Sequence, residues 1–303
     1  MARASRLPSG WPAVLAGLLF GGIGAGLLVA AAARFLEAPP LLLAGFGAIF
    51  LGGGLLIAFQ GWRSAQRARQ VALHPAEPWR FDHGWDPGGA LDETGASARR
   101  AIASAALTAA FLLPFNALAA TRPDDFPLPM ALFLDLAPLA LLARGLFLLA
   151  RRRRHGISRL RFHRFPYLLA EPFEATLVMG QRAPLVRALE VTLSCVEKRP
   201  EEVMGEGSVE TRWVEVELCR ATQTMRGARE LPLRFELPSD GRDLGTDLVS
   251  AADRRWTLRV KGQAPGMNYD ARFLLPVYAA PREEAAAWGS GRRDGDAPGR
   301  ANR

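Results

Sequence analysis

Four apolar blocks that are almost free of charge constrain the fold of this chain more than any other feature. They cover residues 12–33, 41–59, 101–120 and 130–150. The hydrocarbon core of a bilayer is about 30 Å thick, and a helix rising about 1.5 Å per residue crosses it in roughly 20 apolar residues. Each block therefore predicts a membrane-spanning helix, and together they rule out a single water-soluble domain.

The blocks and the segments between them predict the domain organisation. The fold class is an α-helical membrane domain of four transmembrane helices followed by a C-terminal all-β sandwich. The expected parts are a first transmembrane hairpin at 1–60, a cytoplasmic Trp- and Pro-containing loop at 61–100, a second hairpin at 101–150, a cytoplasmic β-sandwich at 156–281 and a disordered tail at 282–303.

The distribution of arginine predicts the direction of insertion. Arginines gather before the first block, between the second and third blocks, and in the run Arg151, Arg152, Arg153 and Arg154 after the fourth, while the two short loops carry one each. Positive residues stay on the cytoplasmic side. We therefore expect a multi-pass protein of the cell inner membrane with both termini cytoplasmic and with residues 34–40 and 121–129 outside. The alternative is that the first block is a cleaved signal peptide, which leaves three spans.

Charge and cysteine content exclude several partners. The net charge is +8, but only Lys198 and Lys261 are lysines, and the arginine excess fits GC-biased coding. No recurring basic and aromatic pattern marks a nucleic-acid surface, so we expect no nucleic-acid partner. Cys195 and Cys219 lack metal-ligand spacing and predict reduced thiols in a cytoplasmic domain. We expect no cofactor and no metal.

Two polar residues lie inside the second pair of blocks. Asn116 lies five residues before Thr121, and Asp135 lies five residues after Met130, so both are roughly 7 to 8 Å inside the outer boundary. Pro114 and Pro138 lie near the same level. We expect Asn116 and Asp135 to hydrogen-bond across the hairpin as a clasp, and the alternative is a proton or ion site.

Small residues in the first two blocks indicate close helix packing. Gly17 with Gly21 and Gly22 with Gly26 form GxxxG pairs, and small residues allow backbones to approach closely in lipid. The second block repeats the spacing at Ala44, Ala48 and Gly52. The first two spans are therefore expected to pack together, and a homo-oligomer through these Gly-rich helices is a further possibility.

The loop between the hairpins contains the residues best suited to catalysis or metal binding. His74, Asp82, His83 and Asp86 carry metal-ligand or acid-base side chains, but their spacing matches no metal motif. The alternative role is structural, with Trp79 and Trp85 docking the loop on lipid headgroups or on the cytosolic domain.

The loop also carries a resemblance. Its sequence HPAEPWRFDHGW, with Pro75, Pro78, Trp79 and Trp85 between two helical hairpins, resembles a group of uncharacterised bacterial inner-membrane proteins with a P-x-x-P-W…W loop. This resemblance implies the order of segments and no activity.

Beyond the arginine run the sequence alternates with a period of two, which is typical of half-buried strands. Five sets of residues each share one predicted face: Leu189 to Cys195, Val214 to Leu218, Leu231 to Leu237, Trp256 to Val260, and Tyr269 to Val277. Stretches such as LEVTLSCVEK and LPLRFELP resemble the strands of arrestin-like and immunoglobulin-like sandwiches. That resemblance implies recruitment of a protein partner through edges and loops.

These observations favour a non-enzymatic membrane anchor and adaptor that presents the sandwich to a protein partner. The four arginines at 151–154 are expected to contact lipid headgroups. Two alternatives stay open, namely a small transporter or channel accessory that uses Asn116 and Asp135, and a membrane-bound enzyme that uses the His74 to Asp86 loop.

Overall fold

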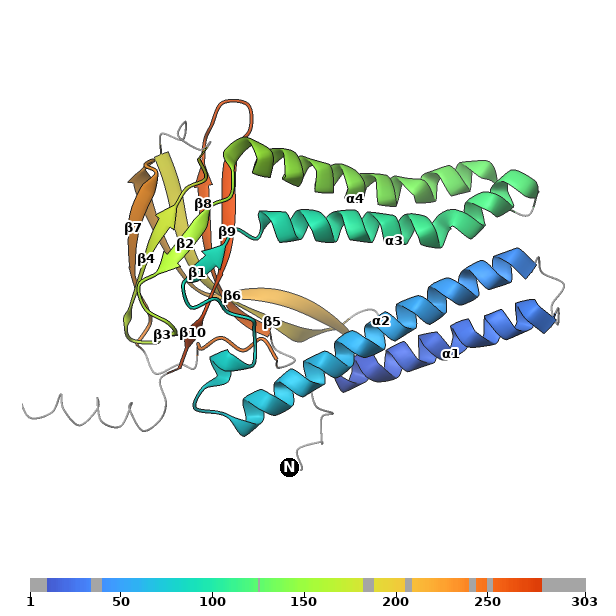
Figure 1. The fold of residues 1–303 in the computed structure, drawn as a ribbon, viewed down its shortest axis with the longest axis horizontal. Helices are drawn as coiled ribbons and strands as arrows, with labels where there is room; N and C mark the ends of the chain where they lie inside the picture. Colours follow the sequence, from blue (N-terminus) through green and yellow to red (C-terminus); the bar gives the residue numbers. More distant parts are fainter. Residues whose placement is uncertain are drawn as a thin grey trace, which may run out of the picture.

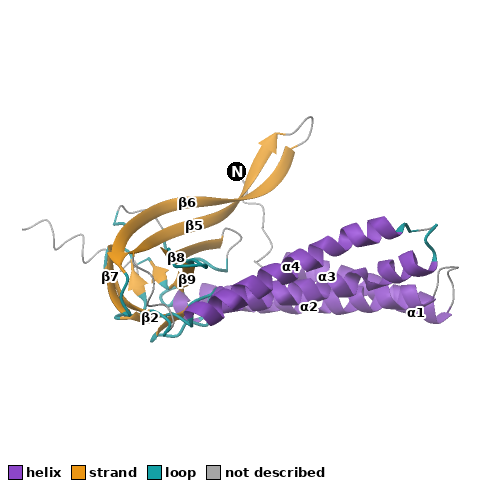
Figure 2. Cartoon of the chain, turned by 90° about the horizontal axis from the view of Figure 1, so that it is seen from above, coloured by secondary structure: helices purple, strands orange, loops and turns teal. Residues whose placement is uncertain are grey.

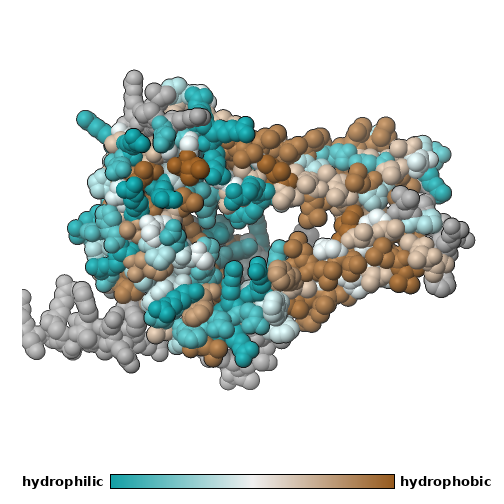
Figure 3. Space-filling view, in the orientation of Figure 1, coloured by the Kyte–Doolittle hydropathy of each residue, from teal (hydrophilic) through white to brown (hydrophobic). Residues whose placement is uncertain are grey.

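The N-terminal half consists of four long helices in two hairpins. The computed structural model describes residues 10–33, 40–124, 126–181, 188–204, 209–239, 244–249 and 253–279. Within these ranges, four helices are long and apolar enough to cross a membrane. Figure 1 shows the hairpins extending in the same direction from a β-rich region, and Figure 3 shows mostly apolar side chains along them. The helices are α1 (Trp11–Ala33), α2 (Pro40–Leu73), α3 (Thr94–Thr121) and α4 (Leu128–His155).

Two of the helices extend beyond the apolar blocks. The arginine-rich segment after the second block continues α2 to Leu73. Helix α3 begins at Thr94, before the apolar block, because the Asp92 carboxylate accepts hydrogen bonds from the Thr94 backbone N–H at 3.0 Å and from its hydroxyl at 2.9 Å. The free N–H groups of a first turn need such acceptors. Between α2 and α3 lie a short helix, η1 (Pro78–Arg80), and a strand, β1 (Gly89–Leu91).

Helices α1 and α2 meet through glycines that repeat every seven residues. Gly10, Gly17 and Gly24 of the first helical segment face Gly61, Gly54 and Gly47 of α2. A Cβ added to Gly24 would lie 2.2 Å from the backbone nitrogen of Leu51, so the backbones are in contact. Two helices at a small crossing angle meet once every two turns, which is about seven residues. The predicted packing of the first two spans is therefore confirmed.

The predicted GxxxG faces are correct only in part. Gly17 lies against α2, and the backbone of Gly21 lies beside Gly54, but an added Cβ would meet open space at Gly21, Gly22, Gly26 and Gly52. Residues spaced four apart move gradually around the helix surface, whereas residues spaced seven apart stay on the face that contacts the partner helix. The interface therefore uses a different set of glycines from the one that the GxxxG pairs indicate.

The two hairpins touch each other through phenylalanines. The ring of Phe46 on α2 lies 6.2 Å from that of Phe111 and 5.0 Å from that of Phe115 on α3, both edge to face. Edge-to-face pairs at these distances are favourable. Contact between the hairpins is thus made by side chains, in contrast to the backbone contact inside the α1–α2 hairpin.

The C-terminal half is mostly antiparallel β-sheet, and we call residues 156–279 the β region. One sheet has the strand order β1-β2-β4-β7 and another has β6-β5-β8-β9. A third, parallel pair joins β10 to β3. Figure 2 shows the long β5 and β6 extending past the other strands. The strands are β2 (Arg159–Phe162), β3 (Tyr167–Leu168), β4 (Pro172–Val178), β5 (Ala188–Met204), β6 (Val209–Arg226), β7 (Glu230–Glu236), β8 (Asp253–Gly262), β9 (Tyr269–Leu275) and β10 (Val277–Tyr278).

Both four-stranded sheets contribute to one hydrophobic core. The core contains the alternating residues predicted for four of the strand faces, at 189–195, 231–237, 256–260 and 269–277. Phe173 of β4, Phe235 of β7 and Phe273 of β9 are among its buried side chains. The period-two pattern therefore identified most of the core correctly.

The predicted face of β6 holds as far as a bulge. Val214, Val216 and Leu218 are partly buried, whereas the residues between them are exposed. The register shifts between Cys195 and Val196 of β5, because Leu218 of β6 is an extra residue without a partner there. Beyond this bulge Cys219 lies opposite the buried Cys195, so from that point the alternate residues of β6 face the core.

Several segments of the chain are described only in part. Between β7 and β8, the described residues include the buried Leu244, whose carbonyl accepts a hydrogen bond from the Trp256 indole at 2.7 Å. This part of the loop is fixed to the core. Residues 205–208, between β5 and β6, and the predicted tail at 282–303 lie outside the described residues.

Candidate functional site

The loop between the hairpins is attached to the last strand of the β region. The Tyr278 hydroxyl donates to Oδ2 of Asp82 at 2.5 Å. The Trp85 indole N–H lies 3.1 Å from Oδ1 of Asp82 and 2.8 Å from the Tyr278 hydroxyl oxygen. The Trp79 ring packs edge to face on Tyr278 at 5.7 Å. We call these four residues the loop junction. Of the two docking surfaces that the sequence left open for the tryptophans, they contact the C-terminal domain, and contact with lipid headgroups stays a prediction.

The loop junction holds a carboxylate in a buried position. Asp82 is only 4% exposed, and this burial raises its pKa, although the hydrogen bonds from Tyr278 and Trp85 favour the charged form and oppose the shift. Burial and the nearby Asp82 carboxylate raise the pKa of Tyr278, so its hydroxyl keeps its proton and acts as a donor. Asp82 is therefore satisfied by one donor from its own loop, Trp85, and one from the distant β10, Tyr278.

The other polar residues of this loop make separate local contacts. A His74 ring nitrogen lies 3.1 Å from the Gln70 carbonyl, and the Asp86 carboxylate accepts a hydrogen bond from the Gly88 N–H at 2.9 Å. His83 packs on Trp85 with 4.5 Å between ring centroids, and burial lowers its pKa. In the part of the chain that the structure describes, no group of three or more His, Cys, Asp or Glu side chains could hold a metal ion.

The prolines of the loop shape its path. Pro78 begins η1, where a residue without an N–H is tolerated. Pro75 lies in the turn before it, which the Glu77 N–H closes on the His74 carbonyl at 3.1 Å. The two prolines thus bring Trp79 to the β region directly after α2.

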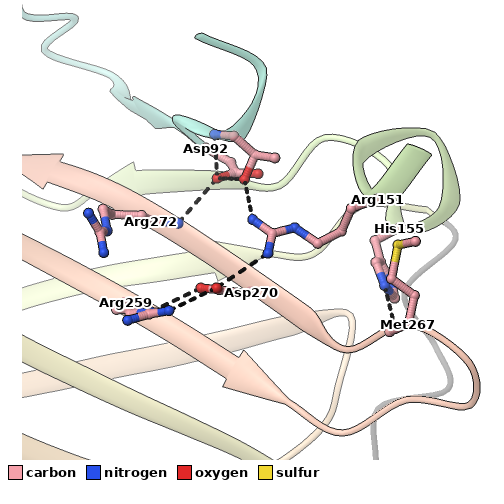
Figure 4. Close-up of polar contacts among 8 residues, drawn as sticks. Asp92, Arg151, His155, Arg259, Met267, Asp270 and Arg272 are labelled. Atoms are coloured by element: carbon pink, nitrogen blue, oxygen red, sulfur yellow. Dashed lines mark hydrogen bonds and ion pairs between the residues drawn. The ribbon is translucent and has the colours of Figure 1, made fainter. Parts of the chain in front are cut away.

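The second hairpin is attached to the β region by an ion network (Figure 4). Arg151, near the end of α4, lies 3.3 Å from Oδ2 of Asp270 on β9 and 3.4 Å from the Thr94 hydroxyl at the start of α3. Arg259 of β8 makes two hydrogen bonds to the same Asp270, at 3.0 and 2.9 Å. We call Asp92, Thr94, Arg151, Arg259 and Asp270 the hairpin junction.

Backbone contacts reinforce the hairpin junction. Oδ1 of Asp92 accepts a hydrogen bond from the Arg272 N–H at 3.1 Å, and the Glu93 N–H donates to the Arg272 carbonyl at 2.9 Å. The residues before α3 therefore extend along β9. At the end of α4, a ring nitrogen of His155 lies 2.9 Å from the Met267 carbonyl (Figure 4).

The arginines around Asp270 favour its ionised form. Its burial alone would raise its pKa, but hydrogen bonds and charge from Arg259, together with the charges of Arg151 and Arg272, outweigh that effect and lower the pKa. A carboxylate between cations keeps its negative charge. The network is therefore a fixed set of charges that joins α4, α3 and the edge of the sheet.

The four arginines after the apolar block do not all face away from the protein. Arg151 belongs to the hairpin junction, Arg154 donates to the Pro265 carbonyl, and Arg152 lies against Gly95 at the start of α3. Contact between Arg151 to Arg154 and lipid headgroups stays a prediction.

The intramembrane polar pair is brought together as expected. The Asn116 amide nitrogen lies 3.1 Å from both carboxylate oxygens of Asp135. The hydrogen bond joins α3 to α4 near the end of the hairpin that is far from the β region. Whether the pair also moves protons or ions stays a prediction.

The residues that attach the hairpins were missed by sequence reasoning. Tyr278, Asp270 and Arg259 occupy ordinary strand positions. Alternation marks Asp270 and Arg259 only as residues that face away from the core. Among the residues of the loop junction, Asp82 and the two tryptophans stand out in the sequence by residue type. Their residue types do not indicate which strand residue they contact.

Comparisons with known proteins give little further information. No family model matches the chain, and no curated protein matches it. Among solved structures, the chain is similar to the crystal structure of Spo0M, a sporulation control protein from Bacillus subtilis. The identity is 12%, the match covers 44% of this chain and 54% of that chain, and the TM-score is 0.27. The chain thus spans about half the length of that protein, and a score this low supports no conclusion.

Proposed function

We propose that this chain is a multi-pass membrane anchor and adaptor. Its four apolar helices cross the inner membrane of a bacterial cell, with both termini and the β region on the cytoplasmic side, and the β region is a sandwich that binds a protein partner. The observation that carries this proposal is the attachment of both helical hairpins to one β region, through the loop junction and the hairpin junction.

The geometry favours an anchored scaffold because both attachments use buried or partly buried groups. Breaking either junction leaves a desolvated charge without its partner, at a cost of about 1 to 3 kcal/mol or more. A β region held at two points keeps a fixed orientation to the bilayer. A fixed orientation lowers the entropy that must be lost when a partner binds.

The β5–β6 ribbon is the part of the β region best suited to a partner. Strand β8 pairs with β5 only as far as Lys198, so the two strands continue beyond it as a ribbon with β6 at the edge of the sheet. Trp213 on this ribbon is 50% exposed and lies under the Lys198 ammonium at 5.8 Å. Exposed edge strands and aromatic residues are common means of protein recognition.

Two experiments test the anchor proposal. Reporter fusions after Tyr278 should be active in the cytoplasm only, and activity in the periplasm would contradict the orientation. Affinity capture from detergent with the full chain and with a chain lacking residues 156–281 should give different partners. Substitution of Trp213→Ala should weaken capture, while Arg161→Ala on β2 serves as the control. Identical partners for all four proteins would contradict the adaptor role.

A second candidate function rests on the Asn116–Asp135 pair. A carboxylate within an apolar helix is costly, and such residues often mark ion or proton paths. If the chain is a small transporter or accessory, Asp135→Asn abolishes an ion-dependent phenotype while the protein level holds. If the pair is only a clasp, Asp135→Asn keeps an amide hydrogen bond and leaves the phenotype unchanged.

A further inference from the structure

A large groove lies where α4 meets the β region. It has a volume of about 1330 Å³ and is bounded by α4 on one side and by β5, β6, β8 and the β8–β9 loop on the other. This volume exceeds the roughly 300 to 1,000 Å³ of sites that hold drug-sized molecules. The groove therefore has room for a polar headgroup and the beginning of its acyl chains.

The floor of the groove is a polar sheet face that lies toward the helices. Leu189, Val260 and Tyr269 point into the core, so their neighbours Glu190, Lys261 and Asp270 lie on the opposite face. These three pair side by side across β5, β8 and β9. Since Asp270 is bound by Arg151 of α4, this face of the sheet is turned toward the helix bundle. Figure 1 likewise shows β8 and β9 beside the end of α4.

The charges around the groove favour an anion. Arg151, Lys261, Glu190 and Asp270 line it. Arg259 binds Asp270 on the same face of the sheet, and Arg154 lies at the rim, where it donates to the Pro265 carbonyl. Four cationic side chains thus surround two carboxylates, and one of these carboxylates is already held by two arginines. The exposed hydroxyls of Thr222 and Thr224 add hydrogen-bonding groups to the lining.

One end of the groove is apolar and lies beside the predicted bilayer. Phe147 lines it, is 53% exposed and belongs to the fourth apolar block. It precedes Arg151 by about one helical turn, or roughly 6 Å toward the membrane. The groove therefore passes from an aromatic side chain at the level of the acyl chains to cations at the level of the headgroups.

From this gradient we infer that the groove binds the headgroup of an anionic glycerophospholipid from the cytoplasmic leaflet. The lipid phosphate lies near Lys261 and Arg151, the headgroup hydroxyls reach Thr222 and Thr224, and one acyl chain runs along Phe147. This inference rests on the proposed membrane crossing.

The experiment is a lipid titration of the full chain in detergent, read by native mass spectrometry. The probes are dioleoyl phosphatidylglycerol, dioleoyl phosphatidylcholine and inorganic phosphate. The wild-type chain is expected to retain one phosphatidylglycerol more tightly than phosphatidylcholine. Each basic residue near an anionic lipid contributes a factor of about five. Lys261→Ala is therefore expected to weaken phosphatidylglycerol binding about fivefold, and Lys261→Glu about 30-fold.

The matched control is Arg161→Glu, which makes the same charge reversal on an exposed position of β2 in the other sheet. Its binding is expected to stay within about twofold of wild type. Equal losses for Lys261→Glu and Arg161→Glu, or no loss for Lys261→Ala, would overturn the inference. Circular dichroism of each variant checks the fold, and Lys261→Ala decides the question if Lys261→Glu does not fold.

Two further outcomes distinguish the lipid site from a site for free anions and from the proposed membrane anchor. Displacement of phosphatidylglycerol by millimolar inorganic phosphate would show a site for free anions and overturn the lipid assignment. Flotation with vesicles tests the proposed function by itself. A Lys261→Ala chain that floats but binds phosphatidylglycerol about fivefold more weakly supports both proposals, whereas a wild-type chain that does not float contradicts the membrane anchor.

Discussion

The glycine contact between α1 and α2 gives the sharpest test of how the first hairpin is held together. A Cβ placed on Gly54 would lie 2.3 Å from the backbone nitrogen of Gly21 and 2.6 Å from the carbonyl oxygen of Gly17. Backbone atoms cannot rotate away as a side chain can. Ordinary van der Waals contact begins near 3.4 Å, so Gly54→Ala forces the two helices apart by about 1.1 Å at this point.

The cost follows from the loss of contact along the helices. Overpacking by one methyl group typically costs about 1 to 3 kcal/mol, and in lipid no hydrophobic effect between helices compensates for lost van der Waals contact. We therefore expect Gly54→Ala to lower the free energy of unfolding by about 2 kcal/mol. Titration with SDS in dodecyl maltoside micelles, followed by tryptophan fluorescence, measures this change.

The neighbouring glycine supplies the control. Gly53 has no atom within 4 Å of its added Cβ, so Gly53→Ala should leave the unfolding midpoint unchanged or raise it slightly, since alanine favours helix. If Gly54→Ala and Gly53→Ala unfold at the same SDS fraction, close backbone contact is not what joins α1 to α2, and the proposed role of the seven-residue repeat is wrong.

Four further predictions concern the β region and its junctions. Tyr278→Phe removes a donor from the buried Asp82 and is expected to cost about 1 to 3 kcal/mol in thermal or chemical unfolding. Because burial raises the pKa of Asp82 in the folded chain, stability should fall as the pH rises above about 4, and Asp82→Asn should remove that slope. Asp270 has a lowered pKa, so its contribution is complete above about pH 4 and is lost on acidification; melting curves between pH 5 and pH 2 should be flatter for Asp270→Asn. The hydrogen bond with Cys219 and burial raise the pKa of Cys195, so mass spectrometry should find no maleimide on Cys195 until the chain is unfolded.

Much of the fold was predictable because its signals are local. Apolar blocks of the right length identify helices without any knowledge of their partners, and the alternation around Leu258 or Phe273 identifies strands in the same way. The failures occurred where a distant contact decided the outcome. The bulge opposite Cys195 changes which residues of β6 face the core from Cys219 onward, and the seven-residue glycine repeat acquires meaning only when α1 and α2 are placed side by side.

The candidate site was predictable to a smaller degree. The Asn116–Asp135 contact was expected because two polar residues at equal depth in adjacent helices have few other partners. Asp82 and Trp85 stood out by composition, but their bond to Tyr278 depends on the path of the whole β region. Arg151 was assigned to the lipid surface because a run of arginines after an apolar block is typical there, and its ion pair with Asp270 has no local signal.

The link between Asp82 and Tyr278 also bears on the order in which the protein matures. The two residues are separated by 196 positions, so the first hairpin, with its connecting loop, is synthesised long before the strand that completes its attachment. Domains generally fold in sequence from the N-terminus during synthesis. Until β10 emerges from the ribosome, the Asp82 carboxylate has no tyrosine partner and stays hydrated, and the final tethering of the first hairpin is among the last events of biogenesis.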